Sequence, residues 1–342
     1  MRIGILTGGG DCPGLNAVIR AVVRRAERGF GDEVIGFRDG WLGVVEDDTT
    51  PLDVEACRGL LPRGGTVLGS SRLQPFGLDD GVERARSTIE RHGLGGLVVV
   101  GGEGTLSCAH RLHAEGFPVV GVPKTIDNDI GGTEMTFGFE TAVEIATEAI
   151  DRLHTTAESH DRVMVVEVMG RHVGHIAAWS GMAGGATLTL VPEEPFDIEE
   201  VCEGVRRRHD RGRYASVVVV AEGARPKPDT IPMPDEEVDR FGHVRLGGIG
   251  NLVAAEIESR TGFETRVTIL GYVQRGGTPT AFDRVLASRF GVAAVDAVHD
   301  GGFGMMTALV GGDIVLVPLA DAVGDLKRLS AGVWEAARVF FA

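Results

Sequence analysis

Short runs of Val, Ile and Leu alternate along the chain with longer amphipathic stretches. Three such pairs are residues 2–7 with 15–28, 97–100 with 106–115, and 162–169 with 174–182. A strand followed by a helix, repeated in this way, is typical of βαβ units, in which a parallel sheet lies between layers of helices. The sequence therefore predicts an α/β fold.

The same pattern predicts further strands at 186–191, 215–221, 265–270 and 305–309, and further helices at 141–153, 198–208, 250–261 and 281–298. Ligands of parallel sheets bind at the carboxyl ends of the strands, so the loops after the strands are the candidate functional segments. Residues 224–247 break the pattern, because they are rich in proline and charge and lack an apolar period. We expect a surface excursion or a mobile loop there.

Composition narrows the class of protein. The chain has 342 residues, 43% of them hydrophobic, which suits two lobes with well-buried cores. A formal net charge of -15 argues against nucleic acid or an anionic membrane as the main partner, since both need a basic surface. The 51 glycines have no collagen-like period, so we expect them in loops that approach a ligand or turn sharply.

Several features predict a cytoplasmic protein. The four cysteines, Cys12, Cys57, Cys108 and Cys202, form neither a CxxC pair nor a zinc-binding pattern, so a reducing compartment is expected. No segment reaches the ~20 apolar residues of a membrane span. The N-terminus lacks the long apolar core and cleavage site of a signal peptide.

The most informative segment is the polar turn after the apolar run 117–122, where Asp127 and Asp129 stand two residues apart. Two carboxylates at the end of a strand can divide the work of phosphoryl transfer, one as the base for a hydroxyl proton and one as a Mg²⁺ ligand. The alternative is an Asx-rich turn that caps a helix. Glycine-rich loops after other predicted strands favour a kinase, because a capping turn needs no such loops.

Two of these loops are suited to phosphate. Gly8, Gly9 and Gly10 leave backbone amides open to an anion before a helix, although the loop matches neither a Walker A motif nor a dinucleotide fingerprint, and a structural turn is the alternative. In the segment 101–105, Glu103 could meet nucleotide-bound Mg²⁺ or could be an ordinary acid at a helix N-terminus.

Arginines beside glycines predict further phosphate contacts. Segment 64–72 suggests a glycine-flanked strand that ends in Arg72, whose guanidinium fits phosphate oxygens. Arg171 and Arg275 follow the same pattern at later strand ends, as a sugar phosphate site would require. Each arginine alone could be a solvated surface residue, so the prediction rests on their joint occurrence.

Taken in order, the segments 8–16, 64–72, 101–105, 124–129, 169–171 and 266–277 resemble the motif set of the 6-phosphofructokinase family, in a mixed subgroup of actinobacterial type. The resemblance implies two Rossmann-like, three-layer lobes with mostly parallel sheets, the phosphofructokinase fold, assembled as a homotetramer without nucleic acid or membrane partners. It places residues 1–138 and 274–324 in a larger lobe that binds the phosphoryl donor. Residues 139–273 and 325–342 would form a smaller lobe that binds the sugar phosphate.

The resemblance also implies a role for individual residues. Asp127 would take the proton from the 1-hydroxyl of fructose 6-phosphate, Asp129 and Glu103 would hold Mg²⁺, and Thr125, Arg171 and Arg72 would assist the transferring phosphoryl group. Donor contacts would come from Gly9, Arg72, Gly102, Glu103, Gly104, Thr105 and Lys124. Sugar phosphate contacts would come from Thr125, Asp127, Met169, Gly170, Arg171, Glu222, Tyr272 and Arg275, with Arg162 and Arg266 from a neighbouring subunit.

The implied reaction is the Mg²⁺-dependent transfer of the ATP γ-phosphoryl group to fructose 6-phosphate, a step of glycolysis. Gly104 favours ATP, because pyrophosphate users of the family carry aspartate there, whereas Lys124 is typical of the pyrophosphate users. Pyrophosphate is therefore the alternative donor. A non-catalytic regulatory homologue that keeps the sugar phosphate site is a second alternative.

Overall fold

The computed structural model describes residues 1–228, 230–232 and 246–341. They form two compact units, of which unit 1 comprises residues 1–141 and 275–327, and unit 2 comprises 142–274 and 328–342. The expected lobe boundaries, after residues 138, 273 and 324, differ from these by one to three residues. Residues 229 and 233–245 of the expected excursion 224–247 lie outside the described residues.

Unit 1 is built on an eight-stranded, mostly parallel sheet within the described residues, with the order β12-β11-β5-β4-β1-β2-β3 and β6 paired to β5. Its strands are β1 (Arg2–Gly8), β2 (Glu33–Phe37), β3 (Thr49–Leu52), β4 (Leu94–Gly101), β5 (Val119–Thr125), β6 (Phe137–Gly138), β11 (Met305–Val310) and β12 (Asp313–Pro318). In the sheet, β1 pairs with β2 on one side and with β4 on the other, so the order in which strands are added reverses at β1. Such a switch point is where α/β sheets bind ligands.

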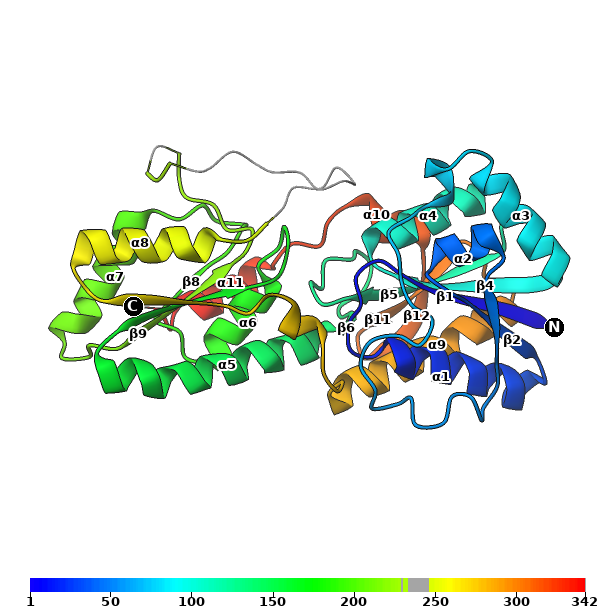
Figure 1. Cartoon of the computed structure of the whole chain (residues 1–342), viewed down its shortest axis with the longest axis horizontal. Coiled ribbons are helices and arrows are strands. Elements are labelled where there is room, and N and C mark those ends of the chain that lie inside the picture. The colour runs from blue at the N-terminus through cyan, green and yellow to red at the C-terminus, as the bar shows by residue number, and fades with distance from the viewer. Residues whose placement is uncertain (229, 233–245, 342) are drawn as a thin grey trace. The chain divides into compact units, whose positions relative to one another are not determined.

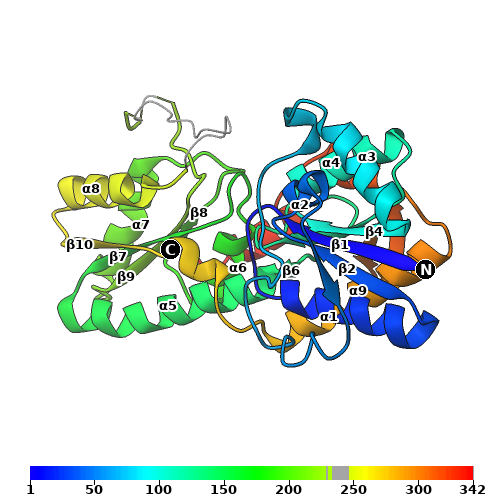
Figure 2. The same ribbon diagram turned by 45° about the vertical axis from the view of Figure 1, so that its right-hand side comes forward.

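Helices cover both faces of this sheet, with α1 and α9 on one face and α2, α3 and α4 on the other (Figures 1 and 2). Their bounds are α1 (Leu15–Arg25), α2 (Trp41–Glu46), α3 (Gly81–His92), α4 (Glu103–Ala114), α9 (Ala281–His299) and α10 (Leu319–Gly324), with a π-helical turn at Ala26–Phe30 and a 3₁₀ turn at Pro75–Gly77. Gly291 lets α1 and α9 pack closely, since a Cβ there would lie 2.9 Å from the Val18 carbonyl oxygen.

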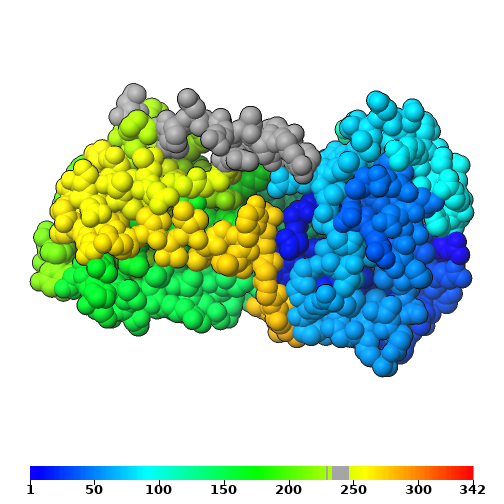
Figure 3. All heavy atoms as spheres, in the orientation of Figure 1, coloured from blue at the N-terminus to red at the C-terminus, as the bar shows by residue number. Residues whose placement is uncertain are grey.

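The described residues of unit 2 form a four-stranded parallel sheet with the order β10-β7-β9-β8. Its strands are β7 (Val163–Val168), β8 (Leu188–Leu190), β9 (Ser216–Ala221) and β10 (Thr265–Ile269). Its helices are α5 (Phe139–His160), which begins in unit 1, α6 (His175–Ala183), α7 (Ile198–Asp210), α8 (Ile249–Thr261) and α11 (Ala331–Arg338), with a 3₁₀ turn at Gly271–Arg275. The outer edge of β10 is exposed between α8 and α5 (Figure 3).

The mostly parallel α/β architecture confirms the predicted fold class. The apolar runs that predicted strands are buried throughout β4 and β9, because helices cover both faces of each sheet. One local prediction is wrong: residues 64–72 form turns and irregular backbone, not a strand. Gly65 and Gly69 have left-handed φ angles of 66° and 71°, and the Val67 amide donates to the Asn16 side chain at 2.9 Å instead of to a sheet neighbour.

Candidate active site

The loop after β1 is held in place by hydrogen bonds of its backbone. Gly9 has a φ angle of 80°, and its amide and carbonyl bind Ser71 O at 3.0 Å and Ser70 Oγ at 2.5 Å. Helix α1 begins after Gly14, and in the described structure no side chain caps that end. The Gly9 amide is therefore used within the protein, and the feature that favours an anion here is the partial positive charge of the helix N-terminus.

The loop after β4, the strand beside β1, packs against the first loop through Thr105. Cβ atoms added at Gly8 or Gly101 would lie 2.8 Å and 2.3 Å from the Thr105 side chain, so both positions need glycine. By contrast, apart from its chain neighbours and the backbone of its own helix, a Cβ at Gly104 would meet only Gln74 Nε2 within 4 Å among the described residues, at 3.6 Å. Position 104 is open, as a bulky phosphoryl donor would require.

Lys124 lies on β5, the next strand of the sheet, and it is almost fully buried. Its Nζ donates to the Gly10 carbonyl at 2.5 Å, and a Cβ at Gly9 would lie 3.4 Å from Nζ. Burial lowers the pKa of this ammonium group, and Arg275 adds to the effect. Three adjacent strands thus bring Lys124, the Gly104 loop and the Gly9 loop to one edge of the sheet.

The carboxylate turn follows β5 at the same edge. The Asp127 amide donates to Thr125 Oγ1 at 3.0 Å, Asn128 has a left-handed φ of 55°, and Asp129 is only 6% exposed. No helix follows the turn directly, because α5 begins at Phe139 after the short strand β6. The alternative of a turn that merely caps a helix is therefore wrong, and the two carboxylates remain candidates for chemistry.

The two carboxylates proposed for Mg²⁺ differ in environment. Glu103 is exposed at the first turn of α4, where Ser107 Oγ donates to it at 2.9 Å, while Asp129 is buried. No group of three or more His, Cys, Asp or Glu side chains in the described residues could hold a metal ion alone. This donor set fits Mg²⁺, which in phosphoryl-transfer sites takes one or two carboxylates and completes its shell with phosphate oxygens and water.

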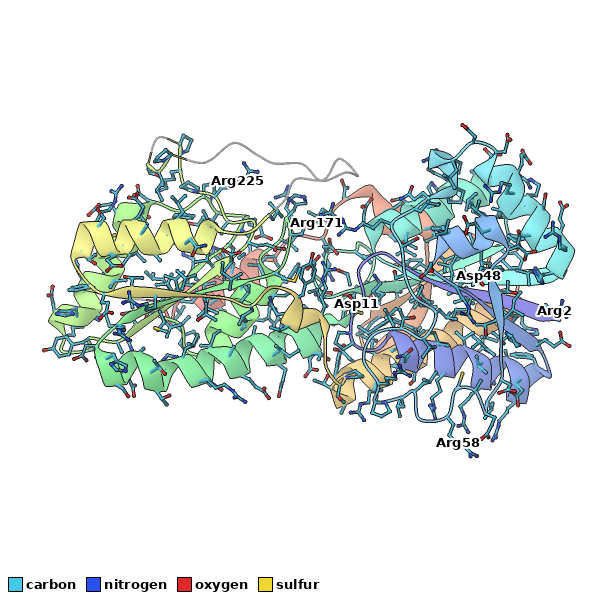
Figure 4. The ribbon with its side chains drawn as sticks, viewed as in Figure 1. Arg2, Asp11, Asp48, Arg58, Arg171 and Arg225 are labelled. Carbon is cyan, nitrogen blue, oxygen red and sulfur yellow. The ribbon has the colours of Figure 1, made fainter. Side chains whose placement is uncertain are left out.

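In unit 2, the loop after β7 carries Met169, Gly170 and Arg171 (Figure 4). Gly170 has a φ of 143° and Arg171 a left-handed φ of 54°, an uncommon conformation for a residue with a side chain. The Arg171 amide donates to Glu222 Oε1 at 3.0 Å, from the loop after the adjacent strand β9. A Cβ at Gly223 would lie 1.9 Å from the Arg171 carbonyl oxygen, so that glycine admits the loop. The structure therefore brings Met169, Gly170, Arg171 and Glu222 together as predicted.

The other predicted residues are distributed as follows. Arg162 and Arg266 both pair with Glu264 at the amino-terminal ends of β7 and β10, Arg162 at 2.8 Å, and Tyr272 is 74% exposed. Arg275 belongs to unit 1, where its Nη1 lies 2.3 Å from the position of a Cβ at Gly10. Arg72 is exposed on the loop that contacts Gly9. The structure therefore places Arg275 against the first glycine loop of unit 1.

Three residues that shape the site were not predicted. Gln74 Nε2 donates to the Gly104 carbonyl at 3.0 Å, and Asn128 organises the carboxylate turn by hydrogen bonds. Lys327 binds that turn from far along the chain. Gln74 and Asn128 stand beside predicted residues, so their position was a usable signal, whereas nothing in the local pattern marks Lys327.

Comparison with known proteins gives a family match over most of the chain: residues 2–298 match the family described as phosphofructokinase. A pyrophosphate–fructose 6-phosphate 1-phosphotransferase of Streptomyces coelicolor is 60% identical over 342 residues, with 100% of both chains covered. ATP-dependent 6-phosphofructokinase 3 of the same organism is also 60% identical, over 329 residues and 96% of each chain. Relatives with either donor are thus equally similar.

Among solved structures, the phosphofructokinase of Saccharomyces cerevisiae matches with a TM-score of 0.84 and 32% identity. The match covers 99% of this chain and 47% of the yeast chain, so this chain spans about half the length of that relative. None of the helices in the described residues is long and apolar enough to cross a bilayer.

Proposed function

The chain belongs to the phosphofructokinase family, and from that premise we propose that it transfers the γ-phosphoryl group of ATP to the 1-hydroxyl of fructose 6-phosphate. The products are fructose 1,6-bisphosphate and ADP. The protein is a phosphotransferase that acts on an alcohol group of a small molecule. The observation that supports the reaction best is the carboxylate turn after β5, beside the glycine loops of β4 and β1.

In this reaction Asp127 accepts the proton of the 1-hydroxyl as the sugar oxygen attacks the γ-phosphorus, and the bond to ADP breaks. Gly9, Gly102, Thr105 and Arg72 bind the donor phosphates, and Thr125 and Arg171 stabilise the charge of the transferring group. Asp129 and Glu103 would hold Mg²⁺, which when bound neutralises phosphate charge. Met169, Gly170, Glu222, Tyr272 and Arg275 bind the sugar phosphate, with Arg162 and Arg266 supplied by a neighbouring subunit.

Position 104 supports ATP as the donor. Outside the backbone of helix α4 and its chain neighbours, a Cβ added at Gly104 would meet only Gln74 Nε2 within 4 Å in the described residues, which supports open space for the bulk of a nucleotide. Pyrophosphate is the second candidate, because Lys124 places a buried cation against the first glycine loop, where a small anion would bind.

An assay with both donors tests the proposal. Purified protein with fructose 6-phosphate and Mg²⁺ is given ATP or pyrophosphate, and fructose 1,6-bisphosphate is measured through aldolase. We expect kcat/KM for ATP to exceed that for pyrophosphate by at least ~10²-fold, about 2.7 kcal/mol in transition-state binding. A preference for pyrophosphate would reverse the donor assignment. Turnover with neither donor would favour a regulatory homologue.

A further inference from the structure

Side-chain hydrogen bonds determine the shape of the carboxylate turn. Asn128 Oδ1 accepts from the Thr136 amide at 3.0 Å, and Thr136 Oγ1 donates to the Thr125 carbonyl at 2.8 Å. Asn128 itself has a left-handed backbone, which asparagine tolerates better than most residues. The conformation of 125–129 therefore depends on where the Asn128 side chain is fixed.

Lys327 contributes to fixing it. Its Nζ donates to Asn128 Oδ1 at 2.7 Å and to the Thr133 and Glu134 carbonyls at 2.9 Å and 3.0 Å. An ammonium group has three N–H donors, so Lys327 Nζ can donate one hydrogen bond to each of these three acceptors. In addition, the Lys327 backbone amide donates to the Asp129 carbonyl at 2.9 Å. One residue thus holds the turn by both its backbone and its side chain.

Helix α10, just before Lys327 in the chain, supports the same contact. The Gly131 amide donates to the Ala322 carbonyl at 3.2 Å, and a Cβ at Gly131 would lie 2.9 Å from the Asp321 carbonyl oxygen. The close approach of these two backbones limits how far the segment with Lys327 can shift away from the turn. The residues that hold the turn are therefore themselves held in unit 1.

Partial burial makes the hydrogen bonds of the Lys327 ammonium group important for stability. Lys327 is half-buried, and its Nζ lies among the acceptors of the turn. A charge that is partly removed from water is costly unless it is hydrogen-bonded. The acceptors of the turn meet that need, so the turn and the lysine stabilise each other.

We propose that Lys327 is a positioning residue that holds Asp127 and Asp129 in their reactive geometry through Asn128 and the Asp129 backbone. The proposal rests on the proposed phosphoryl transfer. In this assignment Lys327 acts through the turn. Its loss should lower kcat much more than it changes KM, because small displacements of a catalytic group slow the chemical step.

The test compares Lys327→Met with Arg328→Met, which removes a cation from the adjacent, exposed position. Steady-state kinetics should show kcat reduced at least ~10-fold in Lys327→Met, with KM for fructose 6-phosphate within ~2-fold. Hydrogen exchange followed by mass spectrometry should show faster exchange in peptides covering 125–136, and Arg328→Met should change neither measurement. If Lys327→Met does not fold, Lys327→Gln keeps two donors and should give the same pattern, weakened.

The Asn128→Gly background adds a second readout. Glycine accepts the left-handed backbone at position 128 but removes the side-chain acceptor of Lys327. The fold reduction in kcat caused by Lys327→Met should therefore be at least ~3-fold smaller in the Asn128→Gly background than in the wild-type background. A kcat within ~2-fold of wild type in Lys327→Met, or exchange that rises equally throughout the chain, would overturn the proposal. If the wild type transfers phosphate from neither donor while exchange at 125–136 rises selectively, the proposed function fails and the positioning contact stands.

Discussion

At the scale of single residues, Asp127 carries the most specific prediction. Asp127→Ser should lower kcat by at least ~10²-fold and leave KM for fructose 6-phosphate within ~3-fold, because a general base acts on the transition state rather than on substrate binding. Steady-state kinetics of purified variants measures both constants. Asp313→Ser, at an exposed position of the same unit, is the control. Near-normal kcat in Asp127→Ser would remove this residue from the role of base.

Gly104 carries the prediction on donor choice. Gly104→Asp would add bulk and negative charge where the nucleotide binds, while pyrophosphate could still bind beside Lys124. We expect kcat/KM for ATP to fall at least ~10²-fold, with pyrophosphate turnover unchanged or newly measurable.

The variant should fold, because among the described residues outside its own helix a Cβ at 104 approaches Gln74 Nε2 at 3.6 Å, an ordinary van der Waals distance. Gly77→Asp is the matched control, since nothing lies within 4 Å of a Cβ at that exposed glycine. An unmutated protein that already uses pyrophosphate and ignores ATP would mean that Lys124 outweighs Gly104.

At the scale of elements, the apolar runs predicted buried strands and amphipathic helices well. The predicted helix at 281–298 is α9 (Ala281–His299), and the predicted strand at 215–221 is β9 (Ser216–Ala221). The pattern did not predict α3, whose buried positions include Gly81 and Thr88, or β12, an exposed edge strand. Elements with little buried apolar surface leave a weak periodic signal.

The same limit explains the residues missed at the site. Motif spacing found the carboxylate turn because its chemistry is local in the sequence. Lys327 binds the turn from 199 residues beyond Asn128, and that contact exists only once β5 and α10 are packed in one unit. A single sequence holds no periodic or motif signal for such a pair.

Asp283 joins the first turns of α5 and α9. Its Oδ2 accepts from the Thr141 amide at 2.8 Å and from Thr141 Oγ1 at 2.5 Å, while Thr280 caps α9 by accepting from the Asp283 amide. The Asp283 side chain is fully buried, and burial raises its pKa to about 6, from 3.8. The ionised form is therefore disfavoured in the folded state, and the cost is present above pH 6 and is relieved as pH falls towards 4.

This sign gives a prediction on stability. Asp283→Asn keeps an acceptor for the Thr141 amide but cannot ionise. The stabilisation of this variant relative to wild type, measured as an increase in the free energy of unfolding, should therefore be larger at pH 8 than at pH 5, by about 1.4 kcal/mol. Urea unfolding at the two pH values measures the difference. An equal effect at both pH values would show that the carboxyl group does not titrate as assigned.

At the scale of the whole molecule, the charge is distributed unevenly. The chain carries a net charge of -15, yet its arginines include two of the predicted substrate residues, Arg171 in the loop after β7 and Arg266 near the start of β10. Anionic substrates need such local positive charge against an acidic background. The net charge thus argues against nucleic acid as the main partner, while individual arginines mark the candidate phosphate sites.

Assembly is the last prediction, and it concerns Arg162 and Arg266. Both pair with Glu264 at the amino-terminal ends of β7 and β10, and if they complete a neighbouring subunit's sugar phosphate site, activity requires the oligomer. Arg266→Ala should raise KM for fructose 6-phosphate at least ~10-fold, since it removes a charged contact to phosphate. Arg58→Ala, which removes an exposed arginine of unit 1, should leave KM unchanged.

Mixed oligomers distinguish a contribution across subunits from one within a chain. Asp127→Ser lacks the base and Arg266→Ala lacks the neighbour's arginine, so each homo-oligomer should be nearly inactive at low fructose 6-phosphate. In a hybrid, the Arg266→Ala subunit keeps Asp127 and receives Arg266 from the Asp127→Ser subunit. Dissociating and reassembling the two variants together should therefore restore activity, because some sites then contain both residues. A mixture without recovery, or a monomer that sedimentation shows to be fully active, would contradict the assignment of Arg266 to the neighbouring site.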